Sequence, residues 1–111
     1  MSNAVHDRTE RQLRKYGLTP DQWERILTHQ HGRCAACGKV FSSTRLACPD
    51  HDHRSGFVRG ALCTPCNYEL GCHHDSTQWF KNVAQYLTHP PAEAAGVHVF
   101  VPGSIGASHE R

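Results

Sequence analysis

The chain has 111 residues and a formal net charge of +2 with neutral histidines, and only 8% of its residues are aromatic. This length allows one small domain with a tail. A domain of fewer than roughly 70–80 ordered residues usually needs a disulfide or a bound metal to stabilise its core. The small net charge does not by itself indicate a nucleic-acid partner. The N-terminus lacks the apolar run of a signal peptide, and no segment approaches the roughly 20 apolar residues of a membrane span, so we expect a cytoplasmic protein.

Basic side chains gather near the N-terminus, and we assign residues 1–17 to an N-terminal basic arm or helix. If the segment is helical, Arg8, Arg11 and Lys15 share one face by their spacing. One interpretation is an arm that lies along a phosphate backbone. The other is an ordinary solvated helix, because acidic residues dilute the charge.

Residues 18–89 are predicted to form the main domain, which begins with a strongly marked helix. Thr19 can cap this helix, Gln22 completes a capping box, and we expect the helix to end near Gln30. Its apolar stripe, which we assign to the core, consists of Trp23, Ile26 and Leu27.

A β-hairpin followed by a short helix is predicted next. The strands are residues 46–48 and 57–62, and residues 54–56 form the turn. Thr64 is expected to cap the short helix and Gly71 to end it.

A last helix is expected to start at Asp75 or Ser76 and to run to about Thr88. Its predicted buried face consists of Trp79, Val83, Tyr86 and Leu87. Residues 90–111 form a tail rich in alanine, glycine and proline that we expect to be mobile, with a weak edge-strand pattern at 97–101.

Four of the six cysteines form two Cys-x-x-Cys pairs separated by 25 residues: Cys34, Cys37, Cys63 and Cys66. Two such pairs can close a tetrahedron of thiolates around Zn²⁺, and a site closed by four cysteines is structural. Zinc bound by four thiolates lowers the net charge by about two units. Two disulfides or free thiols remain the alternative, although a cytoplasmic chain favours the metal.

The remaining cysteines, Cys48 and Cys72, have no such pairing. Cys48 fits a small apolar strand residue. Cys72 precedes His73 and His74, which leaves two interpretations open: a second metal site or an ordinary loop.

A dense run of acidic and histidine side chains lies between the two cysteine pairs. Asp50 and Asn67 offer oxygen ligands for a hard divalent ion. His51 can accept a proton from water near neutral pH, and His53 points to the same side of a strand. Arg59 can contact a phosphate from the second strand. The alternative is a polar hairpin loop with solvated histidines.

The combination of Asp-His-Asp-His at 50–53, Val-Arg-Gly at 58–60 and Cys-x-x-Cys-Asn at 63–67, with Cys-x-x-Cys upstream, resembles the recombination endonuclease VII group of HNH nucleases. The resemblance covers roughly residues 16–87. It implies an α+β fold, a small zinc-stapled ββα-metal (His-Me finger) domain flanked by helices. It also implies a metal-dependent DNA endonuclease that nicks or cuts both strands and leaves 5′-phosphate and 3′-hydroxyl ends.

The resemblance also assigns residue roles. His51 is the general base, Asp50 and Asn67 hold catalytic Mg²⁺ or Mn²⁺, and His53 lies near the scissile phosphate. The four paired cysteines bind structural zinc. The residues predicted to contact DNA or its phosphates are Arg59, Arg54, Arg11 and Lys15.

Some features depart from the group. The chain ends soon after the last predicted helix, the hairpin loop is short, and Pro49 precedes the metal-binding aspartate. Because of these departures we expect a monomer or weak homodimer. We also expect the protein to be encoded by a bacterium or phage, and RNA is an alternative substrate. Two other functions stay open: a non-catalytic zinc-stapled DNA-binding module, and a structural zinc domain that binds protein.

Overall fold

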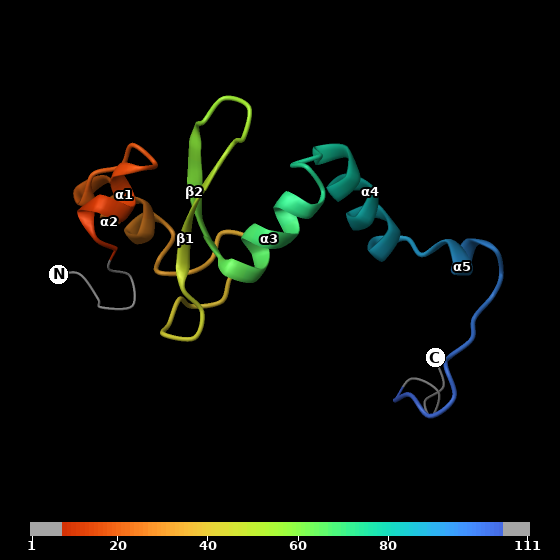
Figure 1. The fold of residues 1–111 in the computed structure, drawn as a ribbon. Helices are drawn as coiled ribbons and strands as arrows, with labels where there is room; N and C mark the ends of the chain where they lie inside the picture. Colours follow the sequence, from red (N-terminus) through yellow and green to blue (C-terminus); the bar gives the residue numbers. More distant parts are fainter. Residues whose placement is uncertain (1–7, 106–111) are drawn as a thin grey trace. The chain divides into compact units, whose positions relative to one another are not determined.

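The computed structural model describes residues 8–105 and divides the chain into two compact units, Met1–Asp75 and Ser76–Arg111. The first unit is an α+β domain with a two-stranded sheet (Figure 1). Its elements are α1 (Glu10–Arg14), α2 (Pro20–His29), β1 (Ala47–His51), β2 (Val58–Cys63) and α3 (Thr64–Cys72). The second unit contains α4 (Thr77–Thr88) and α5 (Pro91–Ala94). None of the described helices has the length and apolar character needed to cross a membrane.

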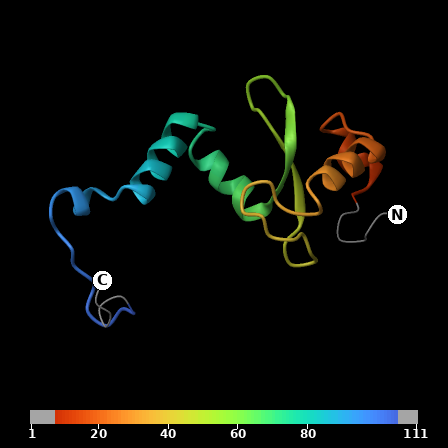
Figure 2. The same cartoon turned by 180° about the vertical axis from the view of Figure 1, so that it is seen from behind.

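The hairpin separates the helices of the first unit. Helices α1 and α2 lie on one side of it and α3 on the other, as the two opposite views show (Figures 1 and 2). The core between α1, α2 and the hairpin consists of Leu13, Trp23, Leu27, Cys34, Phe41, Ala47, Ala61, Leu62 and Cys63. This core is small, as the sequence predicts for a domain that needs a staple.

Helix α1 is shorter than predicted. It runs from Glu10 to Arg14, and the side chain of its N-terminal cap, Thr9, forms a capping box with Gln12. Arg8 lies outside the helix, where its guanidinium Nε donates a hydrogen bond to the Ala47 carbonyl of β1 at 3.0 Å. The predicted common face of Arg8, Arg11 and Lys15 is therefore wrong, because Arg8 is used to attach this segment to the sheet. Residues 1–7 of the predicted arm lie outside the described part of the chain.

Helix α2 agrees with its prediction. Thr19 and Gln22 form the expected capping box, and Gln30 is the C-terminal cap. The Gln30 side-chain amide also pairs with the backbone of β2. Its amide nitrogen donates to the Ala61 carbonyl and its oxygen accepts from the Ala61 N–H, both at 2.9 Å. This contact requires glycine at the neighbouring position, since a Cβ on Gly60 would lie 2.9 Å from the Gln30 oxygen.

Strands β1 and β2 occupy the predicted regions but are shifted along the chain. They pair antiparallel from Ala47↔Cys63 to Asp50↔Gly60, and β1 therefore includes Asp50 and His51. A bulge follows, because His51 pairs with Val58 and leaves Arg59 as the extra residue.

Helix α3 starts one residue earlier than expected. Cys63 is its N-terminal cap, without a side-chain hydrogen bond, and Thr64 and Pro65 are its first two residues. The prediction that Thr64 caps the helix was therefore wrong. The helix also continues through Gly71 to Cys72, because Leu70 packs against the core and holds the last turn.

Helix α4 has the predicted cap, since the Ser76 hydroxyl accepts a hydrogen bond from the Trp79 N–H. Its predicted buried face is wrong: Trp79 is 41% exposed and Leu87 is 70% exposed. The amphipathic spacing produces the helix, but no residue of α4 is buried.

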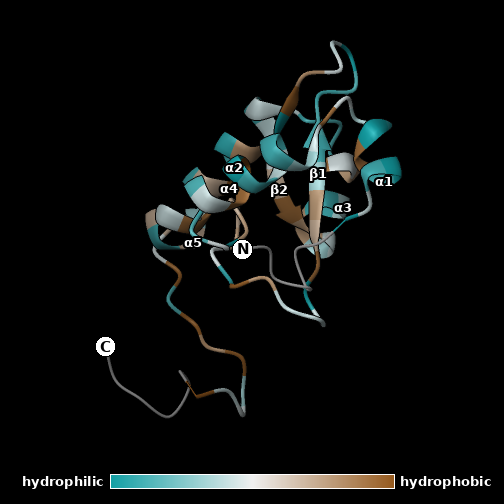
Figure 3. Ribbon diagram, turned by 90° about the vertical axis from the view of Figure 1, so that its left-hand side faces the viewer, coloured by the Kyte–Doolittle hydropathy of each residue, from teal (hydrophilic) through white to brown (hydrophobic). Residues whose placement is uncertain are grey.

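The tail after α4 contains the short helix α5, and residues 97–101 form no strand, contrary to the edge-strand prediction. Several exposed apolar residues lie along this tail, which is coloured largely brown in Figure 3. Residues 106–111 of the predicted tail lie outside the described part.

Candidate active site and metal centre

The four paired cysteines converge at one end of the hairpin. Cys34 and Cys37 belong to the connection after α2, while Cys63 ends β2 and Cys66 lies in the first turn of α3. Their sulfur atoms all lie within 4.8 Å of one another. Zn–S bonds of about 2.3 Å place the sulfurs of a tetrahedral site about 3.8 Å apart. The cluster therefore fits a structural zinc ion.

Hydrogen bonds to the sulfur atoms of Cys34 and Cys63 stabilise their thiolate forms. Burial raises the pKa of the Cys34 thiol, but backbone N–H groups, including that of Cys63 at 3.3 Å, outweigh it and lower the pKa to about 6. Arg45 donates a hydrogen bond to the Cys63 sulfur at 3.4 Å. Burial and the neighbouring thiols instead raise the pKa of Cys66 to about 12. Four thiolates this close repel one another, so a bound dication is what allows all four to ionise together.

The opposite end of the hairpin holds Asp50 and Arg59. The Asp50 side chain is 7% exposed, and Arg59 binds both of its oxygens, with Nε at 2.7 Å and Nη2 at 3.0 Å. The same Nη2 donates to the His51 carbonyl at 3.2 Å. Asp50 raises the pKa of Arg59, so the guanidinium stays charged. Arg59, predicted to contact a phosphate, is thus held on the predicted metal ligand by a forked pair of hydrogen bonds.

The two predicted histidines lie together. The ring centroids of His51 and His53 are 4.7 Å apart. His51 is the last residue of β1 and His53 lies in the turn that follows, so the predicted alternation along one strand does not account for this contact. His53 Nδ1 also lies 3.7 Å from a carboxylate oxygen of Asp75, a residue that the sequence analysis considered only as a possible helix start.

A pocket of about 420 Å³ opens beside His51 and is also lined by Lys15, Tyr16, Gly56 and Val58. The Tyr16 ring centroid lies 5.9 Å from that of His51, and Lys15 Nζ lies 5.5 Å from the Tyr16 centroid. Sequence reasoning missed Tyr16 as a site residue. Its position next to the predicted DNA-contact residue Lys15 was the one available signal.

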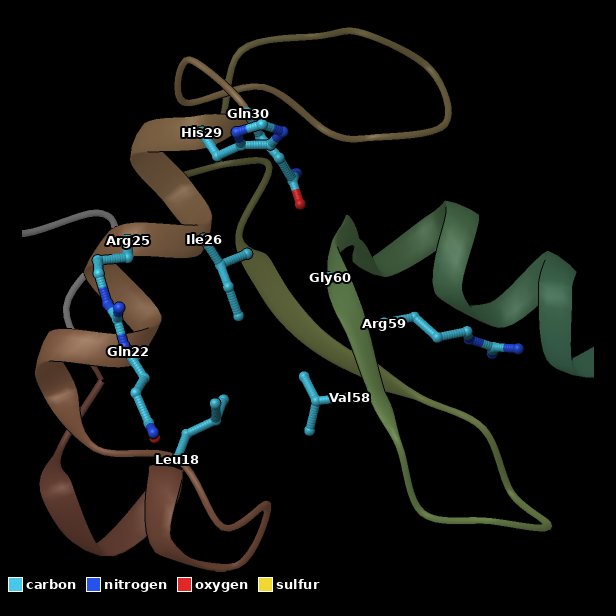
Figure 4. A pocket seen from close by; sticks show the side chains of 9 residues that line it. All are labelled: Leu18, Gln22, Arg25, Ile26, His29, Gln30, Val58, Arg59 and Gly60. Atoms are coloured by element: carbon cyan, nitrogen blue, oxygen red, sulfur yellow. The ribbon is translucent and has the colours of Figure 1, made fainter.

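A second pocket lies between α2 and β2, where Leu18, Ile26, Gln30 and Val58 converge (Figure 4). Arg59 starts from this wall, but its side chain points away from α2 (Figure 4). Neither His51 nor Asp50 lines this pocket, which shares Val58 with the pocket beside His51.

The roles assigned to Asn67, Arg11 and Arg54 stay predictions. Asn67 directly follows Cys66 of the cysteine cluster and is partly buried in the first turn of α3. Arg11 and Arg54 are exposed. The Arg54 backbone N–H, rather than its side chain, forms the hairpin turn by donating to Asp52 at 2.7 Å.

The alternative of a second metal site gains no support. Within residues 8–105, the four paired cysteines are the one group of three or more cysteine, histidine and acidic side chains whose ligand atoms converge. Cys48 lies 3.3 Å from the Thr64 hydroxyl, and His73 lies 3.5 Å from Glu69.

Comparison with known proteins identifies the family. The recombination endonuclease VII family profile matches residues 9–89. The Gene 59 protein of Mycobacterium phage L5 is 43% identical over 81 residues, and that of Mycobacterium phage D29 is 40% identical over the same length. Each alignment covers 72% of this chain and 49% of the relative, so the chain spans about half the length of these relatives. No solved structure matches the chain. The chain belongs to the recombination endonuclease VII family.

Proposed function

We propose that the protein is a metal-dependent DNA endonuclease of the HNH (His-Me finger, ββα-metal) type that hydrolyses phosphodiester bonds. The observation that carries this proposal is the placement of Asp50 and His51 on a hairpin whose other end is closed by the four cysteines. Asn67 follows one of those cysteines, so the zinc site that holds α3 also fixes the Asn67 backbone. Membership of the endonuclease VII family supports DNA as the substrate.

Each residue has a distinct task in the proposed reaction. His51 accepts the proton of the attacking water, and the Tyr16 ring beside it limits the orientations of the imidazole. Asp50 and Asn67 would hold Mg²⁺ or Mn²⁺, which supplies Lewis-acid stabilisation of the charge that develops on the phosphate and the leaving oxygen. His53 stands beside His51 and contacts the scissile phosphate. The products carry 5′-phosphate and 3′-hydroxyl ends.

DNA contacts are proposed for Lys15 at the pocket beside His51, and for Arg11 and Arg54 on the exposed surface. A single copy has one such site and would nick one strand. The phage origin of the two relatives supports a place of action inside an infected bacterial cell.

Supercoiled plasmid tests the proposal. Zinc-loaded protein is incubated with the plasmid in Mg²⁺, in Mn²⁺ and in EDTA, beside the His51→Ala variant. We expect nicking that needs the divalent ion and that falls by about 10²–10⁴-fold in His51→Ala, because the general base is lost. His89→Ala, which removes an exposed histidine of the second unit, is the matched control and should cleave normally. Cleavage by His51→Ala at the wild-type rate would refute the assignment of the base.

One observation favours the second candidate, a non-catalytic zinc-stapled DNA-binding module: Arg59 already neutralises Asp50. This alternative predicts DNA binding that weakens with salt and that is the same with or without Mg²⁺ and His51. A folded, zinc-loaded protein that binds DNA in this way and cleaves neither DNA nor RNA would establish it.

A further inference from the structure

Asp75 lies at the end of the first unit, beside the Arg59 guanidinium and the His53 imidazole. Its Oδ1 is shielded from solvent and accepts no hydrogen bond from the described residues. Arg59 Nη2 lies 3.5 Å from this oxygen, and His53 Nδ1 lies 3.7 Å from the other one. Asp75 also has a positive φ of 57°, which is uncommon for a residue other than glycine. The carboxylate is thus held beside the active site at some conformational cost, with one oxygen incompletely used.

Arg59 therefore faces two carboxylates. It makes a short forked pair with Asp50 and a longer contact with Asp75. Its side chain is 29% exposed, and those of Asp50 and Asp75 are 7% and 21% exposed, so all three charges are partly removed from water. If Arg59 left Asp50 without gaining another carboxylate partner, its partly buried positive charge would lose most of its electrostatic compensation. Asp75 supplies that partner within the same small region.

A divalent ion and Arg59 compete for Asp50. The guanidinium fork uses one lone pair on each Asp50 oxygen, and a second cation placed on the same carboxylate would meet the positive charge of Arg59 at short range. Ion binding is therefore favoured if Arg59 can move away without losing a carboxylate partner.

We propose that Arg59 exchanges between the two carboxylates: it holds Asp50 in the ion-free protein and moves to Asp75 when a divalent ion binds Asp50. This inference rests on the proposed function, which makes Asp50 an ion ligand. Asp75 is then a positioning residue that acts through Arg59 and His53. The exchange keeps the Arg59 and His53 side chains at the end of the hairpin where the phosphate would bind.

Mn²⁺ binding without DNA tests the exchange independently of cleavage. Zinc-loaded wild-type protein, Arg59→Met, Asp75→Asn and the double variant are titrated with Mn²⁺ by calorimetry. Arg59→Met should tighten Mn²⁺ binding by about tenfold, because the competing cation is gone, and Asp75→Asn should weaken it by about tenfold. In the Arg59→Met background, Asp75→Asn should have almost no effect, since the carboxylate acts through Arg59.

A simple field effect gives a different result. If the Asp75 charge only attracts Mn²⁺ through space, Asp75→Asn weakens binding equally in both backgrounds, and this result would overturn the exchange. Asp52→Asn is the matched control, because Asp52 belongs to the same hairpin and its carboxylate bonds to the backbone of Arg54 and Ser55 rather than to Arg59. It should change the Mn²⁺ affinity less than twofold.

Two further measurements separate failure of the exchange from failure of the proposed function. Asp50→Asn should abolish Mn²⁺ binding. If it binds Mn²⁺ like the wild type, or if the wild type binds none, the proposed ion site is wrong and the exchange with it. If Asp50 is the ligand but the nuclear magnetic resonance signal of the Arg59 Nε–H is unmoved by saturating Mg²⁺, only the exchange is overturned.

Should Arg59→Met fail to fold or retain zinc, Arg59→Lys replaces it. The loss of Mn²⁺ affinity caused by Asp75→Asn should shrink in the Arg59→Lys background, because lysine cannot form the forked pair of hydrogen bonds.

Discussion

The two ends of the hairpin differ in burial and in chemistry. At the cysteine end, Ala47, Ala61 and Cys63 are almost completely buried, and side chains from distant parts of the chain close the structure around them. At the turn end, Phe57 is 69% exposed and His53 is also exposed, although Asp50 at this end is buried. Buried residues are concentrated at one end, and the candidate histidines and charged residues lie at the other. Two strands are enough to connect them.

This difference explains how so small a domain can place reactive side chains. A two-stranded hairpin alone is marginally stable in water. Here the cysteine cluster, the Gln30 side chain and the Arg8 guanidinium each hold one strand at the buried end. The bulge at Arg59 then changes the direction of the side chains before the turn.

Removal of the cysteine cluster at the buried end should have the largest effect. Cys37→Ser should lose zinc and cooperative folding of the first unit, because structural zinc in small domains contributes on the order of 10 kcal/mol or more. Zinc content and near-ultraviolet circular dichroism measure the effect. Cys72→Ser removes another exposed cysteine, one outside the cluster, and should leave both properties intact. A Cys37→Ser protein that keeps its zinc and its spectrum would show that the buried end does not depend on the metal.

A smaller loss at the same end is expected from Gln30→Ala. It leaves the N–H and carbonyl of the buried Ala61 without their amide partner, which should cost about 1–3 kcal/mol of unfolding free energy. Urea unfolding of the zinc-loaded protein gives this value. Gln78→Ala, on the exposed surface of α4, is the control for loss of a glutamine side chain. Equal midpoints for the two variants would mean that Gln30 does not support β2.

The smallest effect is expected at the turn end. Backbone N–H groups of Ser55 and Arg54 lower the pKa of Asp52 below its ordinary value of 3.8. Because the folded pKa is the lower one, the ionised side chain stabilises the fold fully above about pH 3.8, and this contribution disappears as the pH falls through the folded value. Asp52→Ala should therefore lower Tm slightly at pH 7.

The Tm difference between wild type and Asp52→Ala, measured at each pH, is the useful quantity, because zinc release affects both proteins. It should shrink towards zero in acid. A difference that grows on acidification would contradict the lowered pKa.

Features that depend on neighbours a few residues away were predictable from the amino-acid sequence. The capping boxes, the end of α2, the cap of α4 and the approximate strand positions follow from residue types at short spacing. Each Cys-x-x-Cys pair presents two thiols from one turn, so the cysteine cluster was predictable as well.

Only the tertiary structure decided which distant side chains meet. Arg8 reaches Ala47, Gln30 pairs with Ala61, and Arg59 stands between Asp50 and Asp75. These contacts depend on the register of the hairpin and on its bulge, which residue spacing does not encode. The apolar face of α4 is exposed because burial also depends on distant residues. Hydrophobic periodicity predicts an amphipathic helix, but the helix is buried only where a second surface packs against it. No residue of α4 is buried.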